Sequence, residues 1–128
     1  MAEILIIDDN QTLLEMVSTA LRFFGHAPTL ALSGEQGLAM LDRGLPDLVL
    51  LDLTMPGMDG YETLRRLREL DGGAGIPVLV LTAAAELDRE ERIRLAGATG
   101  CLHKPVEMDA LAQAVRKYAR HSRRDKAA

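Results

Sequence analysis

Short continuous apolar runs alternate along the chain with longer segments of helical periodicity, and this alternation limits the fold more than any other feature. Unbroken runs rich in Ile, Leu and Val are typical of strands covered on both faces, as in a parallel sheet. Such runs occur at residues 4–7, 48–53 and 78–81, and weaker ones at 28–32 and 100–103. The sequence therefore predicts five mostly buried strands.

The segments between these runs carry apolar residues at helical spacing. The first ends near Phe24, where Gly25 is a stop signal, and the second begins at Ser33, three residues before Gln36, which is the spacing of a capping box. Further helices are predicted over residues 61–70, 86–96 and 108–118, and the fourth has the poorest apolar stripe. The expected inward positions are Leu13, Val17, Leu21, Phe24, Leu64, Leu67, Met108, Leu111, Val115 and Tyr118.

Five strands alternating with five helices and joined by short loops predict a single doubly wound α/β domain, with helices on both faces of a parallel sheet. We expect this domain over residues 1–121 and a short basic tail over 122–128. The formal charge of −4 argues against nucleic-acid binding by the domain as a whole. No apolar run approaches the ~18 residues of a membrane span.

Cysteine content and the first residues bear on where the protein works. A single cysteine, Cys101, cannot form an internal disulfide, which suits a reducing compartment. The chain enters a strand-like run directly at residue 3, without the basic segment of a signal peptide. We therefore expect a cytoplasmic protein.

Polar residues follow the predicted strands where each strand ends. In an open parallel sheet, ligands bind beyond the carboxyl ends of the strands. Those ends carry Asp8-Asp9, Asp52, Thr82 and Lys104-Pro105. We expect three carboxylates, a hydroxyl and an ammonium to meet at one edge of the sheet.

Each of these residues also has an ordinary structural interpretation. Asp8 or Asp9 could cap the first helix, although Asn10 could serve instead. Asp52 could be a turn residue, while Thr82 and Lys104 could be a plain strand residue and a solvated lysine. Together, however, adjacent carboxylates favour a hard cation such as Mg²⁺. An aspartate beside such a cation is a plausible nucleophile toward phosphorus.

The order and spacing of these residues resemble the receiver domain of two-component response regulators. The resemblance rests on Asp8-Asp9, the string from Asp52 to Gly60 (D-L-T-M-P-G-M-D-G), Leu81-Thr82-Ala83 and Lys104-Pro105, and it covers roughly residues 3–120. It implies a flavodoxin-like (βα)5 fold with strand order 2-1-3-4-5. It also implies a phosphorylation-activated signalling protein that assists only its own phosphorylation and dephosphorylation and is not otherwise an enzyme.

The resemblance assigns a role to each matching position. Asp52 would accept the phosphoryl group, and Mg²⁺ (or Mn²⁺) would be held by Asp9 and Asp52 directly, by Asp8 through water and by the backbone carbonyl of Thr54. The phosphoryl group would be bound by Lys104, Thr82 and the amide of Ala83. Gly60 and Pro105 would have structural roles, and the Lys104-Pro105 bond is expected to be cis, against a base rate of about 5–6%.

The family's partners follow in the same way. The donor would be a sensor histidine kinase or a phosphotransfer protein. The switched surface would comprise the fourth helix, the fifth strand and the fifth helix, and it would act on a downstream effector protein or an output domain outside this sequence. A homodimer through that surface is a further expectation, whereas direct nucleic-acid or membrane contact is not expected.

Cys101 departs from the family pattern, which has Tyr or Phe three residues before the lysine. We interpret Cys101 as a small buried hydrophobe at an atypical switch position, with a redox-sensing thiol as the alternative. Thr54 and Ala84, two residues after Asp52 and Thr82, are small and poorly suited to organising an attacking water. We therefore expect that autodephosphorylation is not especially fast.

Other functions remain alternatives at this point. A Mg²⁺-dependent phosphatase of the haloacid dehalogenase type would need a second aspartate two residues after Asp52, where the chain has Thr54. A flavodoxin-type cofactor carrier would need a phosphate-binding loop where Asp8-Asp9 stands. A receiver that has lost phosphorylation would lack acceptor-site residues that are all present here. The chain could also be the N-terminal receiver of a larger DNA-binding regulator.

Overall fold

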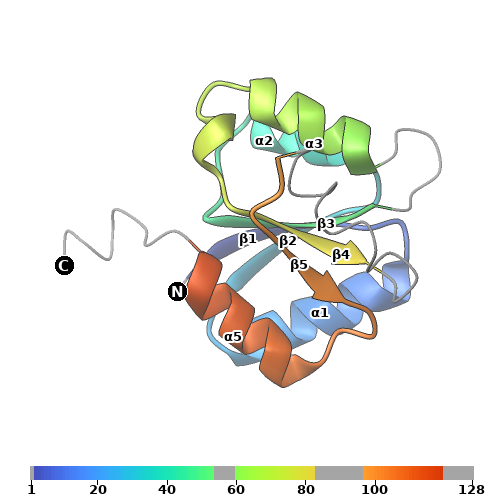
Figure 1. Ribbon diagram of the computed structural model, residues 1–128. Helices are drawn as coiled ribbons and strands as arrows, with labels where there is room; N and C mark the ends of the chain where they lie inside the picture. Colours follow the sequence, from blue (N-terminus) through green and yellow to red (C-terminus); the bar gives the residue numbers. More distant parts are fainter. Residues whose placement is uncertain (1, 54–59, 83–96, 120–128) are drawn as a thin grey trace.

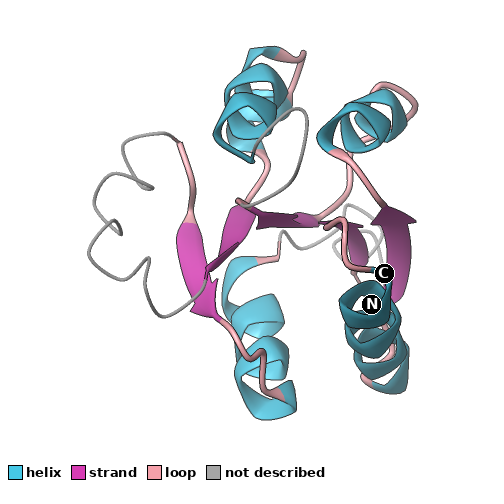
Figure 2. Ribbon diagram, turned by 90° about the vertical axis from the view of Figure 1, so that its right-hand side faces the viewer, coloured by secondary structure: helices cyan, strands magenta, loops and turns pink. Residues whose placement is uncertain are grey.

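The protein is a parallel sheet covered by helices on both faces (Figures 1 and 2). The computed structural model describes residues 2–53, 60–82 and 97–119. Its strands are β1 (Glu3–Ile7), β2 (Ala27–Ala31), β3 (Leu48–Asp52), β4 (Val78–Thr82) and β5 (Gly100–His103). All neighbouring pairs are parallel, in the order β2-β1-β3-β4-β5. The five predicted strands and their order are confirmed.

The described helices are α1 (Gln11–Phe23), α2 (Gly34–Leu41), α3 (Gly60–Glu69) and α5 (Met108–Tyr118), with a short 3₁₀ helix, η1 (Gly73–Gly75). Four of the five predicted helices are confirmed within a few residues. The predicted helix over residues 86–96 lies outside the described residues. In Figure 1, α2 and α3 lie on one side of the sheet and α1 and α5 on the other.

Alternate strand residues face opposite layers because side chains on a strand alternate between its two faces. Ile4, Ile6 and Leu50 pack with buried residues of α1 and α5, whereas Leu5 and Val49 pack with those of α2 and α3. At the roughly 25 cal/mol per Å² of apolar surface removed from water, these two layers supply most of the stabilising free energy. The layers hold the strand ends in fixed positions.

The helix starts explain two local predictions. Asn10 caps α1, because its side chain accepts a hydrogen bond of 3.1 Å from the Leu13 N–H. Ser33 likewise accepts from Gln36 N–H at 3.1 Å, but the Gln36 side chain accepts from Leu32 N–H rather than completing a capping box on Ser33. The cap of α1 therefore leaves both preceding aspartates available for other roles.

Three details of the helices differ from the predictions. Met108, expected to face the core, is 53% exposed because it opens α5 beside a surface groove shared with α1 residues such as Met16. Leu14 is buried in α1, whereas the expected Leu13 is only partly buried. η1 was not predicted, because its Gly-Ala-Gly sequence carries no apolar periodicity.

Among the described residues, no helix has the length and apolar character needed to cross a membrane.

Candidate functional site

The ends of β1 and β3 bring acidic side chains together at the carboxyl edge of the sheet. Asp8 and Asp9 follow β1, and Asp52 is the last residue of the neighbouring strand β3. One carboxylate oxygen from each of the three lies within 4.8 Å of the others. Asp8 and Asp52 are almost completely buried, whereas Asp9 is exposed. The predicted convergence of the three aspartates is confirmed as geometry.

Lys104 reaches this acidic group from the segment that follows β5. Its Nζ lies 3.2 Å from Oδ1 of Asp52, to which it donates a hydrogen bond, and 3.6 Å from Oδ2 of Asp8. The lysine side chain is 30% exposed, so it approaches the buried carboxylates from the solvent side. Among the described residues, one ammonium thus faces three carboxylates, which leaves the cluster with a net negative charge.

Asp8 has the most perturbed environment of the three aspartates. Burial raises the pKa of the Asp8 carboxyl, and the charges of Asp52 and Asp9 raise it further. A hydrogen bond of 2.9 Å from Asn10 N–H to Oδ1, together with the charge of Lys104, acts in the opposite direction. The other oxygen, Oδ2, is buried and has no hydrogen-bond partner among the described residues.

These features fit a divalent cation. Lys104 is the one ammonium that the described residues place beside these three carboxylates, and it lies 3.6 Å from Oδ2 of Asp8, so closely spaced and partly buried carboxylates remain costly unless further positive charge compensates them. Oxygen ligands from closely spaced carboxylates are also the donor set that Mg²⁺ prefers. The residues present therefore suit a hard metal ion bound among Asp8, Asp9 and Asp52.

Thr82 is placed at the same edge by β4, the neighbour of β3. It is buried, and its backbone carbonyl accepts a hydrogen bond of 2.7 Å from Lys104 N–H. Thr82 pairs in register with His103, the residue directly before the lysine. Asp8, Asp52, Thr82 and Lys104 thus lie at or directly after the carboxyl ends of four different strands, at one edge of the sheet.

Two residues of structural importance lie at the border of the site. Gly60 opens α3 directly against β3, and its N–H donates to the carbonyl of Leu53 at 3.1 Å. A Cβ at this position would lie 2.6 Å from the backbone oxygen of Asp52 and would also clash with Cα of Leu53, so only glycine fits. The Lys104-Pro105 peptide bond is cis, as expected.

Some of the predicted site residues lie outside the described residues. These are Thr54 with its backbone carbonyl, Ala83 with its amide, and Ala84. Their predicted roles stay predictions.

Cys101 occupies the atypical position on β5. It is a half-buried cysteine outside any disulfide, and it packs, with Tyr61 of α3 and Ala98, against the buried side chains of Leu53 and Val80. This contact supports its interpretation as a small hydrophobe next to the site.

Sequence reasoning missed the part that Asn10 plays beyond capping α1. Its own backbone N–H holds one oxygen of Asp8, so Asn10 orients this carboxylate as well. The Asp-x-Asn spacing signals such a local turn, because aspartate side chains bond to the backbone two residues onward.

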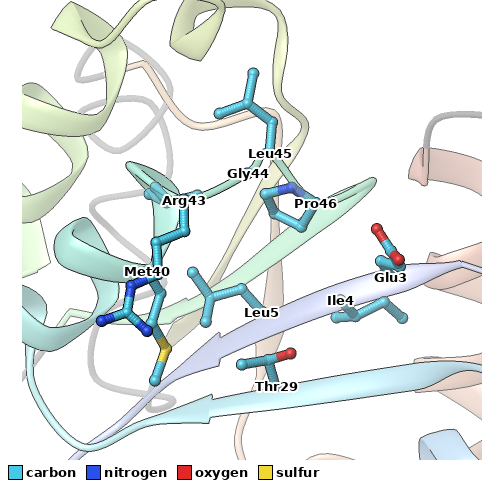
Figure 3. Close-up of a pocket in the computed structure, with 10 residues that line it drawn as sticks. Glu3, Ile4, Leu5, Thr29, Met40, Arg43, Gly44, Leu45 and Pro46 are labelled. Atoms are coloured by element: carbon cyan, nitrogen blue, oxygen red, sulfur yellow. The ribbon is translucent and has the colours of Figure 1, made fainter.

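A separate surface hollow lies away from the acidic cluster (Figure 3). It has a volume of about 300 Å³ and is lined by β1, β2, the end of α2 and the following loop, including Arg43 and Met40. Its lining contains none of the candidate residues named above, and among the described residues the group of acids that could hold a metal lies at the carboxyl edge instead. The carboxyl edge is therefore the candidate functional site.

Comparison with known proteins links this geometry to a family. A family model described as the response regulator receiver domain matches residues 4–116. Sporulation initiation phosphotransferase F of Bacillus subtilis is 36% identical over 116 residues, which cover 91% of this chain and 92% of that protein. The sensor histidine kinase RcsC of Salmonella typhi is 36% identical over 124 residues, 97% of this chain.

Solved structures give the same result. The chemotaxis protein CheY4 of Vibrio cholerae has a TM-score of 0.87 and 29% identity, covering 92% of this chain and 98% of that one. A CheY-like receiver domain protein of Methanospirillum hungatei has a TM-score of 0.82 and 28% identity, covering 91% of this chain and 92% of that one. The chain spans only 10–13% of the length of the sensor proteins RcsC and BvgS, to which it is also similar.

Proposed function

The chain belongs to the response regulator receiver domain family of two-component systems, and from this premise we propose that Asp52 accepts a phosphoryl group from a histidine kinase or a phosphotransfer protein. The observation that carries the proposal is the hydrogen-bonded pair of Asp52 and Lys104 within a group of three aspartates, of which Asp8 and Asp52 are buried. The family generally acts as a signalling switch. The phosphatase alternative is not favoured by any of the matches.

The proposed reaction is an in-line transfer onto a carboxylate oxygen of Asp52. That oxygen bonds to phosphorus while the bond between phosphorus and the donor nitrogen breaks, and the electron pair leaves with the imidazole. The product is an acyl phosphate on Asp52. Because the transferred group spreads negative charge over its oxygens, positioned cations and donors contribute most of the catalysis.

A metal ion would be held at the same place by Asp8, Asp9 and Asp52, with the carbonyl of Thr54 as a further proposed ligand. Bound Mg²⁺ or Mn²⁺ would neutralise the carboxylates and the charge on the phosphoryl oxygens. The support for this proposal is the spacing of the three carboxylates and the buried Oδ2 of Asp8.

The protein's own groups would then hold the phosphoryl group. We infer that Lys104, which already lies 3.2 Å from Oδ1 of Asp52, pairs with a phosphoryl oxygen after transfer. The hydroxyl of Thr82 and the amide of Ala83 are the proposed donors to the other oxygens. The burial of Thr82 supports this role, because a donor shielded from water interacts more strongly with the added charge.

Phosphorylation would change the conformation of a binding surface. This surface would be formed by β5, α5 and the predicted fourth helix. We propose that this surface binds an effector protein or an output domain, that a homodimer uses the same surface, and that the domain catalyses nothing beyond its own phosphorylation and dephosphorylation. A cytoplasmic location is proposed because the single cysteine of the sequence cannot form an internal disulfide.

The proposed function is tested by incubating the protein with acetyl phosphate and Mg²⁺ and measuring its intact mass. We expect one addition of about 80 Da, the mass of one phosphoryl group. The addition should be absent from Asp52→Asn, which keeps the shape of the side chain but removes the nucleophile. It should persist in the control Asp71→Asn, which changes an exposed aspartate in the turn after α3.

Chelation of the metal should also abolish the addition. A wild-type protein that stays unmodified with donor and Mg²⁺ present would contradict the proposal, and so would an Asp52→Asn variant that is labelled as fast as the wild type.

A further inference from the structure

Arg68, on the last turns of α3, binds the backbone at the opposite end of the sheet from the acidic cluster. Its Nη1 donates to the carbonyls of Gly73 and Ile76 at 2.7 and 2.6 Å. Its Nε and Nη2 both donate to the carbonyl of Gly97, at 2.9 and 2.6 Å. One half-buried guanidinium thus ties three separate carbonyls to one helix.

These carbonyls lie where the chain enters two adjacent strands. Only Pro77 separates Ile76 from the first residue of β4. Two residues separate Gly97 from the first residue of β5. The two entrances are also bonded to each other, because Val78 N–H donates to Oγ1 of Thr99 and Thr99 N–H donates to the carbonyl of Val78. Arg68 therefore holds α3, the start of β4 and the start of β5 as one unit.

The conformation of Gly97 fits this arrangement closely. Its φ is +109°, a backbone conformation that side-chain-bearing residues rarely adopt. An added Cβ would lie 3.4 Å from Cγ of Arg68, so the arginine stem packs directly over this glycine. Burial lowers the pKa of Arg68.

The same strands carry the phosphoryl-binding groups at their other ends. Thr82 ends β4, and Lys104 follows β5 at most about 23 Å from Gly97, since seven residues of extended chain rise ~3.3 Å each. β5 is an edge strand whose only strand neighbour in the described sheet is β4. Asp8 and Asp52, by contrast, come from β1 and β3, which have strand neighbours on both sides.

We propose that Arg68 is a positioning residue for the phosphoryl transfer: by fixing the entrances of β4 and β5 against α3, it sets where Lys104 lies relative to Asp52. This inference rests on the proposed function. The strands that carry the metal-binding aspartates receive no hydrogen bond from Arg68, so its loss affects the lysine side of the site and leaves the carboxylates in place.

The test compares Arg68→Met, which keeps an apolar stem and removes every donor, with Arg66→Met as the matched control. Arg66 lies two residues away on the same helix, where it is exposed and pairs with Glu62. Two quantities are measured at a temperature where all variants are folded by circular dichroism. They are the affinity for Mg²⁺ alone, and the rate of labelling by acetyl phosphate at saturating Mg²⁺ and donor.

For Arg68→Met we expect a roughly tenfold lower saturated rate, because a misplacement of about 1 Å can cost up to ~10²-fold. Its Mg²⁺ affinity should stay within about twofold of the wild type, and Arg66→Met should match the wild type in both quantities. Hydrogen exchange at the amide of Thr99 should be faster in Arg68→Met. This measurement reports the loss of the Arg68 hydrogen bonds independently of phosphorylation. Arg68→Gln, which keeps some donors, serves as the second variant if the methionine variant does not fold, with an intermediate loss expected.

An unchanged saturated rate in Arg68→Met would overturn the inference, and so would a loss of Mg²⁺ affinity as large as the loss of rate. Both results leave the proposed function intact, because the wild type is still labelled. A wild type that is not labelled at all would overturn the proposed function and this inference with it.

Discussion

Two groups of charged side chains lie within one small domain and differ in almost every physical respect. The site cluster consists of Asp8, Asp9, Asp52 and Lys104 at the carboxyl edge of the sheet. The α3 ladder consists of Glu62, Arg65, Arg66 and Glu69 on the surface of α3. The site cluster is mostly buried and carries three acids against one base, whereas the ladder is exposed and balanced at two against two.

The carboxyl groups respond in opposite directions. In the ladder, hydrogen bonds from Arg65 and Arg66 lower the pKa of Glu62 to about 2, so the charged form is satisfied by its neighbours. In the site cluster, burial raises the pKa of Asp8, so the charged form is the unfavourable one. Balanced surface pairs contribute little to stability and are screened by salt. A buried cluster with excess negative charge lowers the stability of the fold. Such a cluster is typical of a site whose ligand supplies the missing positive charge.

The largest effect is expected from removing the cation of the site cluster. Lys104→Met removes the ammonium that forms ion pairs with the buried carboxylates of Asp8 and Asp52, and losing one partner of a buried ion pair costs about 3 kcal/mol. Because the lysine is partly exposed, we expect the free energy of unfolding to fall by about 2–3 kcal/mol. This is measured by urea unfolding of the metal-free protein. Saturating Mg²⁺ should restore part of this loss. Equal losses in Lys104→Met and Arg66→Met would remove the distinction between the two groups.

The next effect concerns the contact between α3 and the site. Gly60→Ala forces a Cβ against Leu53 and the carbonyl of Asp52, and such overpacking costs about 1–3 kcal/mol. Gly44→Ala is the matched control, since a Cβ there meets nothing within 4 Å. We expect thermal unfolding to show a clear drop for the first variant and almost none for the second. The difference would vanish if α3 could move away from β3 freely.

A smaller effect of the opposite sign is expected at Asp8. Asp8→Asn removes a buried charge near two other carboxylates, so the metal-free protein should gain about 1 kcal/mol while its Mg²⁺ affinity falls. The pKa of Asp8 is raised above 3.8, so the folded wild type holds this proton longer than the unfolded chain does. Its metal-free stability therefore falls as the pH rises from about 4 through that raised value.

The advantage of Asp8→Asn should accordingly grow over the same pH range, as measured by urea unfolding in the presence of a chelator. An advantage that shrinks with rising pH would show that the Asp8 carboxylate is stabilised in the fold, as Glu62 is.

The smallest effect is expected for Glu62→Gln in the α3 ladder. The lowered pKa means that any stabilisation is present above 4.5 and is lost as the pH falls toward about 2. Because Glu62 lies partly exposed on the surface of α3, water and salt screen the interaction, and we expect a thermal shift close to the measurement error that disappears at high salt. A large shift that resists salt would mean that the ladder, like the site cluster, is shielded from water.

The contrast between buried and exposed charges also explains how far the sequence could predict this molecule. The strands and the convergence of Asp8, Asp9 and Asp52 were predictable, because apolar runs mark strands and strand ends share one edge. The depth of the site was not, since the burial of Asp8 depends on the packing of distant segments. Arg68 was also hidden, because a charged residue on a helix normally predicts a solvated face.

The errors have physical causes as well. Met108 matches the apolar stripe of α5, but it lies on the first turn, beside the open groove next to α1 rather than over the core. η1 is a short turn of small residues, closed by the hydrogen bond from Ile76 N–H to the carbonyl of Gly73, and periodicity does not detect it. In both cases the position within the fold, rather than the residue type, decides the outcome.

The most direct test of the account is chemical mapping of the modified residue. Borohydride reduces an acyl phosphate on aspartate to homoserine, which peptide mass spectrometry locates along the chain. After treatment with acetyl phosphate and Mg²⁺, we predict homoserine at position 52 and none at positions 8 and 9, with the signal lost when Mg²⁺ is chelated. Homoserine at Asp8 or Asp9, or equal labelling without metal, would contradict the account.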